Sequence, residues 1–193
     1  KDLFNQNKTR DSFNIDPNDN LIFKAINQFR DLTKWNVKFE VYLDKKIPIG
    51  AGLGGGSANA ASTLVLLRNL YNKEHCMRKI AVSTLYNIGI NLGSDVPACI
   101  CSKDLRLEGY GNKIKRTRVI NNHYFLLINP NINLSTKEVF KHYDNSNSNE
   151  HSIPDTCFGN IKIYNSLLSS AIDLAPQILS VLSNLQKTKS ITA

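Results

Sequence analysis

The feature that most constrains this 193-residue chain is a glycine-rich stretch that runs into an alanine-rich segment. It reads Pro48-Ile49-Gly50-Ala51-Gly52-Leu53-Gly54-Gly55-Gly56-Ser57-Ala58. Glycine reaches positive φ at little steric cost and lets backbone N–H groups approach a ligand closely. Residues 57–70 have helical spacing, and the first N–H groups of a helix are unpaired and lie at the positive end of its dipole. Because such donors favour an anion, the stretch predicts a phosphate-binding loop.

Two better-known phosphate motifs fit this stretch less well. A Walker A loop ends in Gly-Lys-Ser/Thr, whereas Gly55-Gly56-Ser57 contains no lysine. The spacing of Gly50, Gly52 and Gly55 satisfies the dinucleotide fingerprint, but that motif follows a buried parallel strand. Residues 37–43 instead alternate apolar and polar side chains, which is typical of a strand buried on one face. A dinucleotide site and a purely structural glycine turn remain open as alternatives.

A second motif, Gly93-Ser94-Asp95-Val96-Pro97, lies downstream. A residue before proline is biased toward extended geometry, so we expect Asp95 on a turn between a helix and a strand at 98–101. The two motifs resemble the GHMP kinase superfamily. Within it, the triple glycine at 54–56 is similar to the branch that phosphorylates a cytidine diphosphate-linked methylerythritol. The resemblance covers about residues 19–165 of the chain.

The resemblance implies an α+β fold of two domains. A ribosomal protein S5 domain 2-like ATP-binding domain would occupy residues 1–116, and a partial ferredoxin-like domain residues 117–193. It also implies that the γ-phosphate of ATP, accompanied by Mg²⁺, is transferred to the 2-hydroxyl of the cytidyl-linked methylerythritol in non-mevalonate isoprenoid synthesis. A GHMP kinase for another alcohol and an RNA-binding module of the same fold family stay open as alternatives.

The resemblance assigns site residues in three groups. Asp95 matches the catalytic aspartate that orients or deprotonates the acceptor hydroxyl. Residues 48–58 would wrap the ATP phosphates, and three residues match positions near adenine: Asn20, Leu21 and Lys45. Thr136 and Phe140 match the cytidine end, where Phe140 would stack on the base. The family's early Pro-x-Lys motif and late Gly-Ser/Thr-Gly motif are not found, so we expect an internal piece of such a kinase that is inactive by itself.

Composition adds a few limits. The net charge of +8 favours polyanionic partners, but Lys and Arg are spread along the chain. They approach a cluster only at 113–118, which we expect to be a solvated strand or hairpin face. We therefore expect no nucleic-acid partner. No apolar run approaches the roughly 18 residues of a membrane span, so we expect no membrane partner. The four cysteines have no metal-ligand spacing, which predicts neither zinc nor disulfides and a cytoplasmic setting.

Oligomeric state and targeting are weakly constrained by the sequence. We expect a monomer or a weak homodimer with a small-molecule substrate. The chain begins at Lys1 rather than Met, so plastid-type targeting stays open.

Periodicity predicts the remaining elements. Helices are expected over about 21–32, 77–88, 165–174 and 176–185, and Ser135-x-x-Glu138 is a capping box for another helix. A strand followed by a glycine-containing turn is expected over 105–112, and a buried strand over 125–128.

Overall fold

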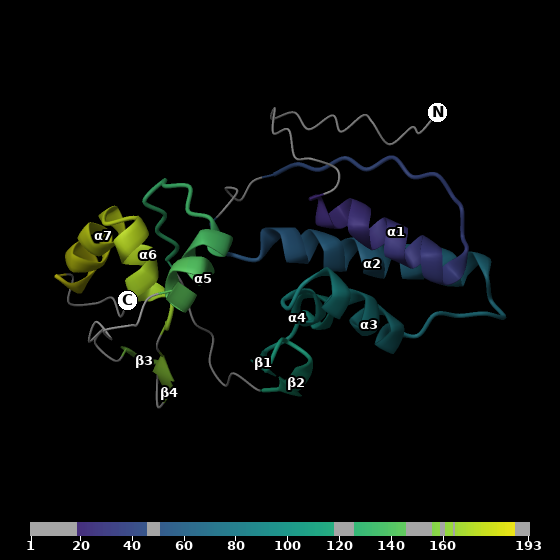
Figure 1. Cartoon of the computed structure of the whole chain (residues 1–193). Coiled ribbons are helices and arrows are strands. Elements are labelled where there is room, and N and C mark those ends of the chain that lie inside the picture. Colours follow the sequence, from purple (N-terminus) through teal and green to yellow (C-terminus); the bar gives the residue numbers. More distant parts are fainter. Residues whose placement is uncertain are drawn as a thin grey trace. The chain divides into compact units, whose positions relative to one another are not determined.

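The computed structural model describes residues 19–45, 51–117, 126–145, 156–158, 161–163 and 165–187. The chain forms two compact units, which are described separately below (Figure 1). Among the described residues, 19–45 and 54–117 belong to the first unit, whereas 51–53 and the residues from 126 onward belong to the second.

The first unit is mainly helical. Its elements are α1 (Leu21–Thr33), α2 (Gly55–Glu74), α3 (Val82–Leu92), α4 (Val96–Cys101), β1 (Leu105–Glu108) and β2 (Lys113–Arg116). The two strands pair antiparallel, with Leu105 opposite Arg116 and Glu108 opposite Lys113. The predicted strand and glycine-containing turn are confirmed, and together with β2 they form a hairpin. Lys115 makes an ion pair with Glu108 across this hairpin at 3.1 Å.

The core of the first unit lies between α1 and α2, which run side by side in Figure 1. Helical spacing places one apolar stripe of each helix inward. The buried residues of α1 are Ile22, Ala25, Ile26 and Phe29, and those of α2 are Ala60, Ala61, Leu64, Leu67 and Tyr71. Fully burying a large apolar side chain contributes about 1.5–3 kcal/mol, so this stripe is a main source of the unit's stability.

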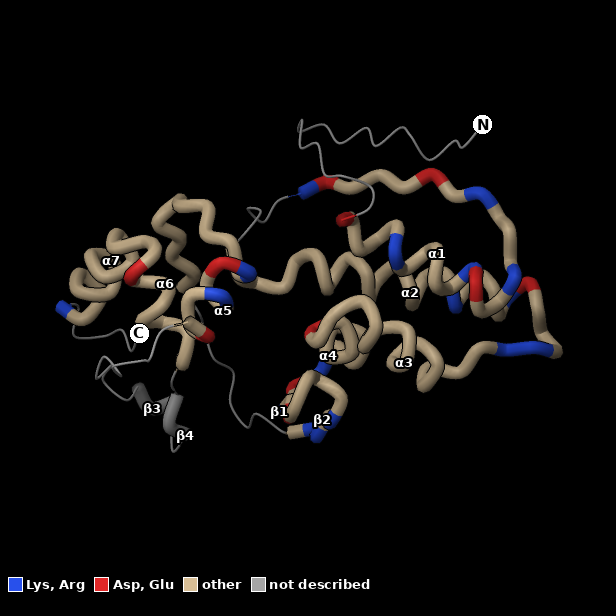
Figure 2. Tube along the Cα trace, in the orientation of Figure 1, with Lys and Arg blue, Asp and Glu red and all other residues tan. Residues whose placement is uncertain are grey.

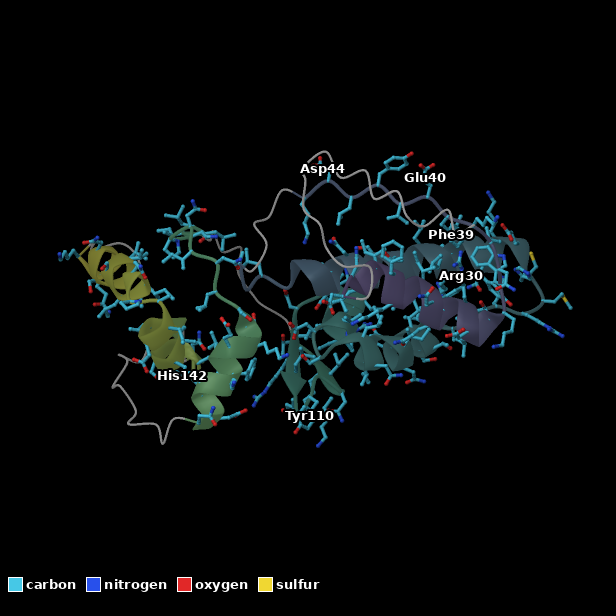
Figure 3. The ribbon with its side chains drawn as sticks, turned by 45° about the horizontal axis from the view of Figure 1, so that its top comes forward. Arg30, Phe39, Glu40, Asp44, Tyr110 and His142 are labelled. Carbon is cyan, nitrogen blue, oxygen red and sulfur yellow. The ribbon has the colours of Figure 1, made fainter. Side chains whose placement is uncertain are left out.

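The segment that joins α1 to α2 corrects one prediction. Residues 37–43 keep the predicted alternation, with half-buried apolar side chains packed against the core and exposed polar ones between them. They form no strand ladder with any other described residue. Arg30 instead donates a hydrogen bond to the Val37 carbonyl, and its guanidinium lies 5.8 Å from the centre of the Phe39 ring (Figure 3). Hydrophobic periodicity thus determined which side chains face inward, but a strand also needs a hydrogen-bonding neighbour.

The predicted strand at 98–101 is wrong, because these residues belong to α4. Pro97 lies in the first turn of that helix. Backbone N–H groups in a first turn make no hydrogen bond within the helix, so the lack of an N–H in proline costs nothing there, and its fixed φ suits the helix. Val96 is the first residue of α4 despite preceding a proline.

The helix expected over 77–88 begins later, at Val82, and continues through Gly89 to end before Gly93. The Asn72 side chain explains part of this shift. It binds both the backbone N–H of Ile80, at 2.7 Å, and its carbonyl, at 3.0 Å, and so holds the chain in a non-helical path there.

The second unit contains α5 (Thr136–Asn145), β3 (Thr156–Phe158), β4 (Ile161–Ile163), α6 (Leu168–Leu174) and α7 (Gln177–Gln186). The Ser135 hydroxyl accepts a hydrogen bond from the Glu138 N–H at 3.5 Å, as the capping box predicts. Helix α6 packs against both α5 and α7, and the predicted helices at 165–174 and 176–185 are confirmed with α6 starting three residues late.

The predicted buried strand at 125–128 is wrong for its described part. Leu126 and Leu127 are 72% and 71% exposed and have no strand partner among the described residues. Residue 125 lies outside the described residues. None of the helices in the described ranges combines the length and apolar character needed to cross a bilayer.

Candidate active site

The first turn of α2 offers unpaired backbone donors. Gly54 precedes the helix with φ +65°, and the first helical hydrogen bond runs from Ala58 N–H to the Gly54 carbonyl at 2.9 Å. The N–H groups of Gly55, Gly56 and Ser57 therefore have no acceptor within the helix. An added Cβ on Gly54 would meet no described atom within 4 Å, so the space beside this turn is open.

Two predicted site residues from distant parts of the sequence meet this turn. The Lys45 ammonium nitrogen lies 3.5 Å from where a Cβ of Gly55 would be, and a methyl carbon of Leu21 lies 3.6 Å from the equivalent point on Gly56. The helix start carries the positive end of the macrodipole, so a lysine there adds like charge. No ion pair links Lys45 to a carboxylate in the described part of the chain. An anion such as phosphate would relieve this repulsion.

Asn20 caps the helix next to that turn. Its side-chain oxygen accepts a hydrogen bond from Ile22 N–H at 2.9 Å, which fixes the start of α1 and therefore Leu21. Asn20 is therefore next to Leu21, the residue that approaches Gly56. Contact of Asn20 with adenine stays a prediction.

Asp95 lies at the N-terminal end of α4 with an exposed side chain. Its backbone carbonyl accepts from Cys99 N–H at 3.1 Å, and its carboxylate accepts from the Ser94 hydroxyl at 3.3 Å. Helix α4 packs on α2 and α3, so the backbone at Asp95 is supported by packed helices while its carboxylate remains accessible.

Two titratable groups on α3 and α4 are shifted by this environment. Burial, followed by the nearby Asp95 charge, raises the pKa of the Cys99 thiol from its ordinary value of 9.0. Burial, followed by the neighbouring Cys101, raises the pKa of Tyr86. Both groups therefore stay protonated at neutral pH, which argues against a nucleophilic thiol beside Asp95. The described cysteines Cys76, Cys99 and Cys101 are free thiols.

Thr136 and Phe140 lie on α5 in the second unit, one helical turn apart and both exposed. Residues four apart share a helix face, and the Phe140 ring is 51% exposed, so the ring is available for stacking. Ala51, Gly52 and Leu53 also belong to the second unit, whereas Pro48, Ile49 and Gly50 lie outside the described residues.

Sequence reasoning missed one residue next to the site. Gly111, in the β1–β2 turn, is buried against the backbone of Ser94. The pair of glycines in Gly109-Tyr110-Gly111-Asn112 was a signal for a turn but carried no information about what the turn contacts.

Lys and Arg are scattered over the elements of both units in Figure 2, with Asp and Glu among them. Lys113, Lys115 and Arg116 are exposed on β2, as expected for a solvated hairpin face. No group of three His, Cys, Asp or Glu side chains in the described ranges is arranged to hold a metal ion.

Comparison with known proteins matches the part of the chain that carries both motifs. The family described as "GHMP kinases N terminal domain" matches residues 20–103, which span α1, α2, α3, α4 and Asp95. Residues 20–103 therefore match the GHMP kinase N-terminal domain, in agreement with the resemblance carried by the two motifs.

Curated bacterial proteins are similar to this chain. A protein of Clostridium acetobutylicum named 4-diphosphocytidyl-2-C-methyl-D-erythritol kinase is 35% identical over 132 residues, which is 68% of this chain and 45% of the relative. A Shewanella loihica protein of the same name is 39% identical over 122 residues, 63% of this chain and 41% of the relative. The chain spans about half the length of these curated relatives.

A solved structure shares the fold. The crystal structure of a 4-(cytidine 5'-diphospho)-2C-methyl-D-erythritol kinase matches with a TM-score of 0.59 over 87% of this chain and 62% of that chain, at 22% sequence identity. The GHMP kinase fold, mixing helices with small antiparallel sheets, is therefore confirmed.

Proposed function

We propose that the protein containing this chain is an ATP-dependent kinase that phosphorylates the 2-hydroxyl of 4-diphosphocytidyl-2-C-methyl-D-erythritol, in non-mevalonate isoprenoid synthesis. One observation carries the proposal: Lys45 and Leu21 converge on the unpaired amides at the start of α2, inside a GHMP kinase domain. The names of the relatives support the choice of the cytidyl-linked substrate.

The chemistry needs positioning and neutralisation of charge more than covalent participation. The amides of Gly55, Gly56 and Ser57 and the Lys45 ammonium would hold the ATP phosphates, with residues 48–58 wrapped around them. Mg²⁺ prefers oxygen ligands and would arrive on the phosphate oxygens. The exposed Asp95 carboxylate would orient the acceptor hydroxyl and take its proton. Support for this role comes from its accessible position on a packed helix.

The substrate's cytidine end would be bound through the second unit. Phe140 would stack on the base and Thr136, on the same face of α5, would contact the nucleotide. We further propose that residues 1–116 form the ribosomal protein S5 domain 2-like domain and residues 117–193 part of the ferredoxin-like domain. A monomer or weak homodimer in the cytoplasm stays a prediction.

The test is a substrate panel with the full-length gene product. ATP consumption is measured with the cytidyl-linked methylerythritol, mevalonate, homoserine and galactose, each at equal concentration, and RNA binding is titrated over a range of salt. We expect turnover with the first substrate only and no salt-dependent RNA binding. Preference for another alcohol would reject the substrate assignment, and RNA binding without turnover would reject the kinase.

A further inference from the structure

The β1–β2 turn lies directly on the peptide that precedes Asp95. Gly111 is buried with φ +77°, and a Cβ placed on it would overlap the Ser94 carbonyl oxygen. The same Cβ would lie 2.9 Å from the Ser94 carbonyl carbon and 3.3 Å from its Cα. Since these atoms are backbone, no side-chain rotation could relieve the overlap. The turn and the Ser94 peptide are therefore in contact that only glycine permits.

This contact bears on Asp95 through the geometry of the peptide bond. The Ser94 carbonyl and the nitrogen and Cα of Asp95 lie in one plane, so holding the carbonyl also holds the start of Asp95. On the other side, Cys99 N–H bonds to the Asp95 carbonyl at 3.1 Å. The Asp95 backbone is thus held by α4 from one end and by the hairpin turn from the other.

We propose that Gly111 is a positioning residue for the phosphoryl transfer, because it lets the β1–β2 turn fix the placement of the Asp95 carboxylate. The proposal rests on the function proposed above, in which Asp95 acts on the acceptor hydroxyl. Small displacements of a reacting group are costly: a shift of about 1 Å can lower turnover about a hundredfold. A side chain at position 111 forces a displacement of this kind at Ser94.

The same turn contains a matched control. Gly109 also has positive φ, +65°, but among the described residues a Cβ there would meet only the Asn112 side chain, whose oxygen would lie 2.8 Å away. That atom ends a side chain and can rotate away. Alanine at 109 or 111 imposes similar left-handed backbone strain, whereas only alanine at 111 collides with Ser94.

The experiment compares Gly111→Ala with Gly109→Ala in the full-length enzyme, measuring kcat, the KM for ATP and the melting temperature. We expect Gly111→Ala to lower kcat about a hundredfold at unchanged KM for ATP. Gly109→Ala should stay close to the wild type in both constants, with a smaller loss of melting temperature than Gly111→Ala, because its backbone strain comes without a backbone collision. Equal kcat in the two variants would overturn the proposal.

A double-variant cycle tests whether the effect acts through Asp95. In the Asp95→Asn background, Gly111→Ala should cause little further loss of kcat, because the group it misplaces is already absent. A full additional loss would show that Gly111 acts by another route and would overturn the proposal.

A shortened turn covers the case in which Gly111→Ala does not fold. Replacing residues 109–112 with Asn-Gly keeps Glu108 opposite Lys113, suits a two-residue hairpin and removes the contact without adding a collision. We expect this variant to fold and to lose kcat. Wild-type kcat in it would overturn the proposal.

Hydrogen exchange separates failure of this inference from failure of the proposed function. Exchange of the backbone amides over residues 93–99 should be faster in Gly111→Ala than in Gly109→Ala, whether or not the protein is a kinase. Equal exchange rates in the two variants would show that the contact between Gly111 and Ser94 does not hold this segment in place, and would overturn the proposal. An inactive wild type with this difference in exchange would instead reject the proposed function alone.

Discussion

Gly54, before α2, and Gly111, in the β1–β2 turn, share a left-handed backbone with φ of +65° and +77°. Their surroundings are opposite. A Cβ on Gly54 would meet no described atom within 4 Å, whereas one on Gly111 would overlap the backbone of Ser94. Conformation favours glycine at both positions, but packing requires it only at Gly111.

One residue type thus has two different effects in the two turns. The open turn leaves backbone amides and space for a ligand, so its glycines matter for binding. The closed turn leaves no space, so its glycine matters for the position of a neighbouring segment. Variants in the two turns should therefore change different kinetic constants.

The largest effect is expected at the residue that the closed turn supports. Asp95→Asn keeps the size of the side chain but removes the base, so kcat of the full-length enzyme should fall about 10²–10⁴-fold. The affinity for ATP, which depends on the open turn, should stay unchanged. Steady-state kinetics measures kcat, and ATP titration measures the affinity. A fall in kcat of less than about tenfold would mark Asp95 as structural.

A smaller effect is expected in the open turn. Gly55→Ala puts a methyl group 3.5 Å from the Lys45 nitrogen, an ordinary contact distance, so stability should hold or improve because alanine favours helix. The methyl group occupies the approach to the unpaired amides. We expect ATP to bind about 10–100-fold more weakly, as for loss of a charge-assisted hydrogen bond of about 1.5–3 kcal/mol.

Calorimetric ATP titration measures this change, and Ser62→Ala, at an exposed position of the same helix, is the control. Unchanged ATP affinity in Gly55→Ala would mean that the open turn has only a structural role.

The smallest effect is expected on the reactivity of Cys99, which tests the electrostatic contact with Asp95 and needs no measurement of turnover. The Asp95 charge disfavours the Cys99 thiolate, so Asp95→Asn should lower the pKa of Cys99 toward 9.0 and speed its alkylation a few-fold. The exposed Cys76 provides the internal control within each sample. Equal Cys99 rates with and without the carboxylate would contradict this electrostatic contact.

The same thiol gives a pH dependence of stability. The pKa of the Cys99 thiol in the folded protein lies above 9.0. The contribution of this thiol to the free energy of unfolding is therefore fully present below about pH 9 and declines as the pH rises further.

Local signals explain the elements that were predicted well. The stripe of α1 at 22, 25, 26 and 29 and the capping box at Ser135 depend on residues within one or two turns of each other. The glycine stretch likewise predicted a helix start with unpaired amides, although α2 begins at Gly55 rather than Ser57. The match of residues 20–103 to the GHMP kinase family confirms the resemblance that the two glycine-containing motifs carried.

Other features depended on partners far along the chain. Residues 98–101 could form a strand or a helix by pattern, and packing of α4 on α2 and α3 decided for the helix. Residues 126–128 have the apolar character of a buried strand, yet they are exposed and pair with no other strand among the described residues. The roles assigned to the individual site residues, and the domain boundary at 116/117, stay predictions.

Local sequence set the backbone conformation of the glycine turns and of the capped helix starts, because φ preferences, capping and periodicity are properties of neighbouring residues. It therefore determined that Gly54 and Gly111 form turns and that α2 begins with free amides. Only the tertiary structure decided that Lys45 lies at those amides and that Gly111 lies on Ser94. Such contacts join segments separated by many residues, and close packing between elements, not local preference, selects them.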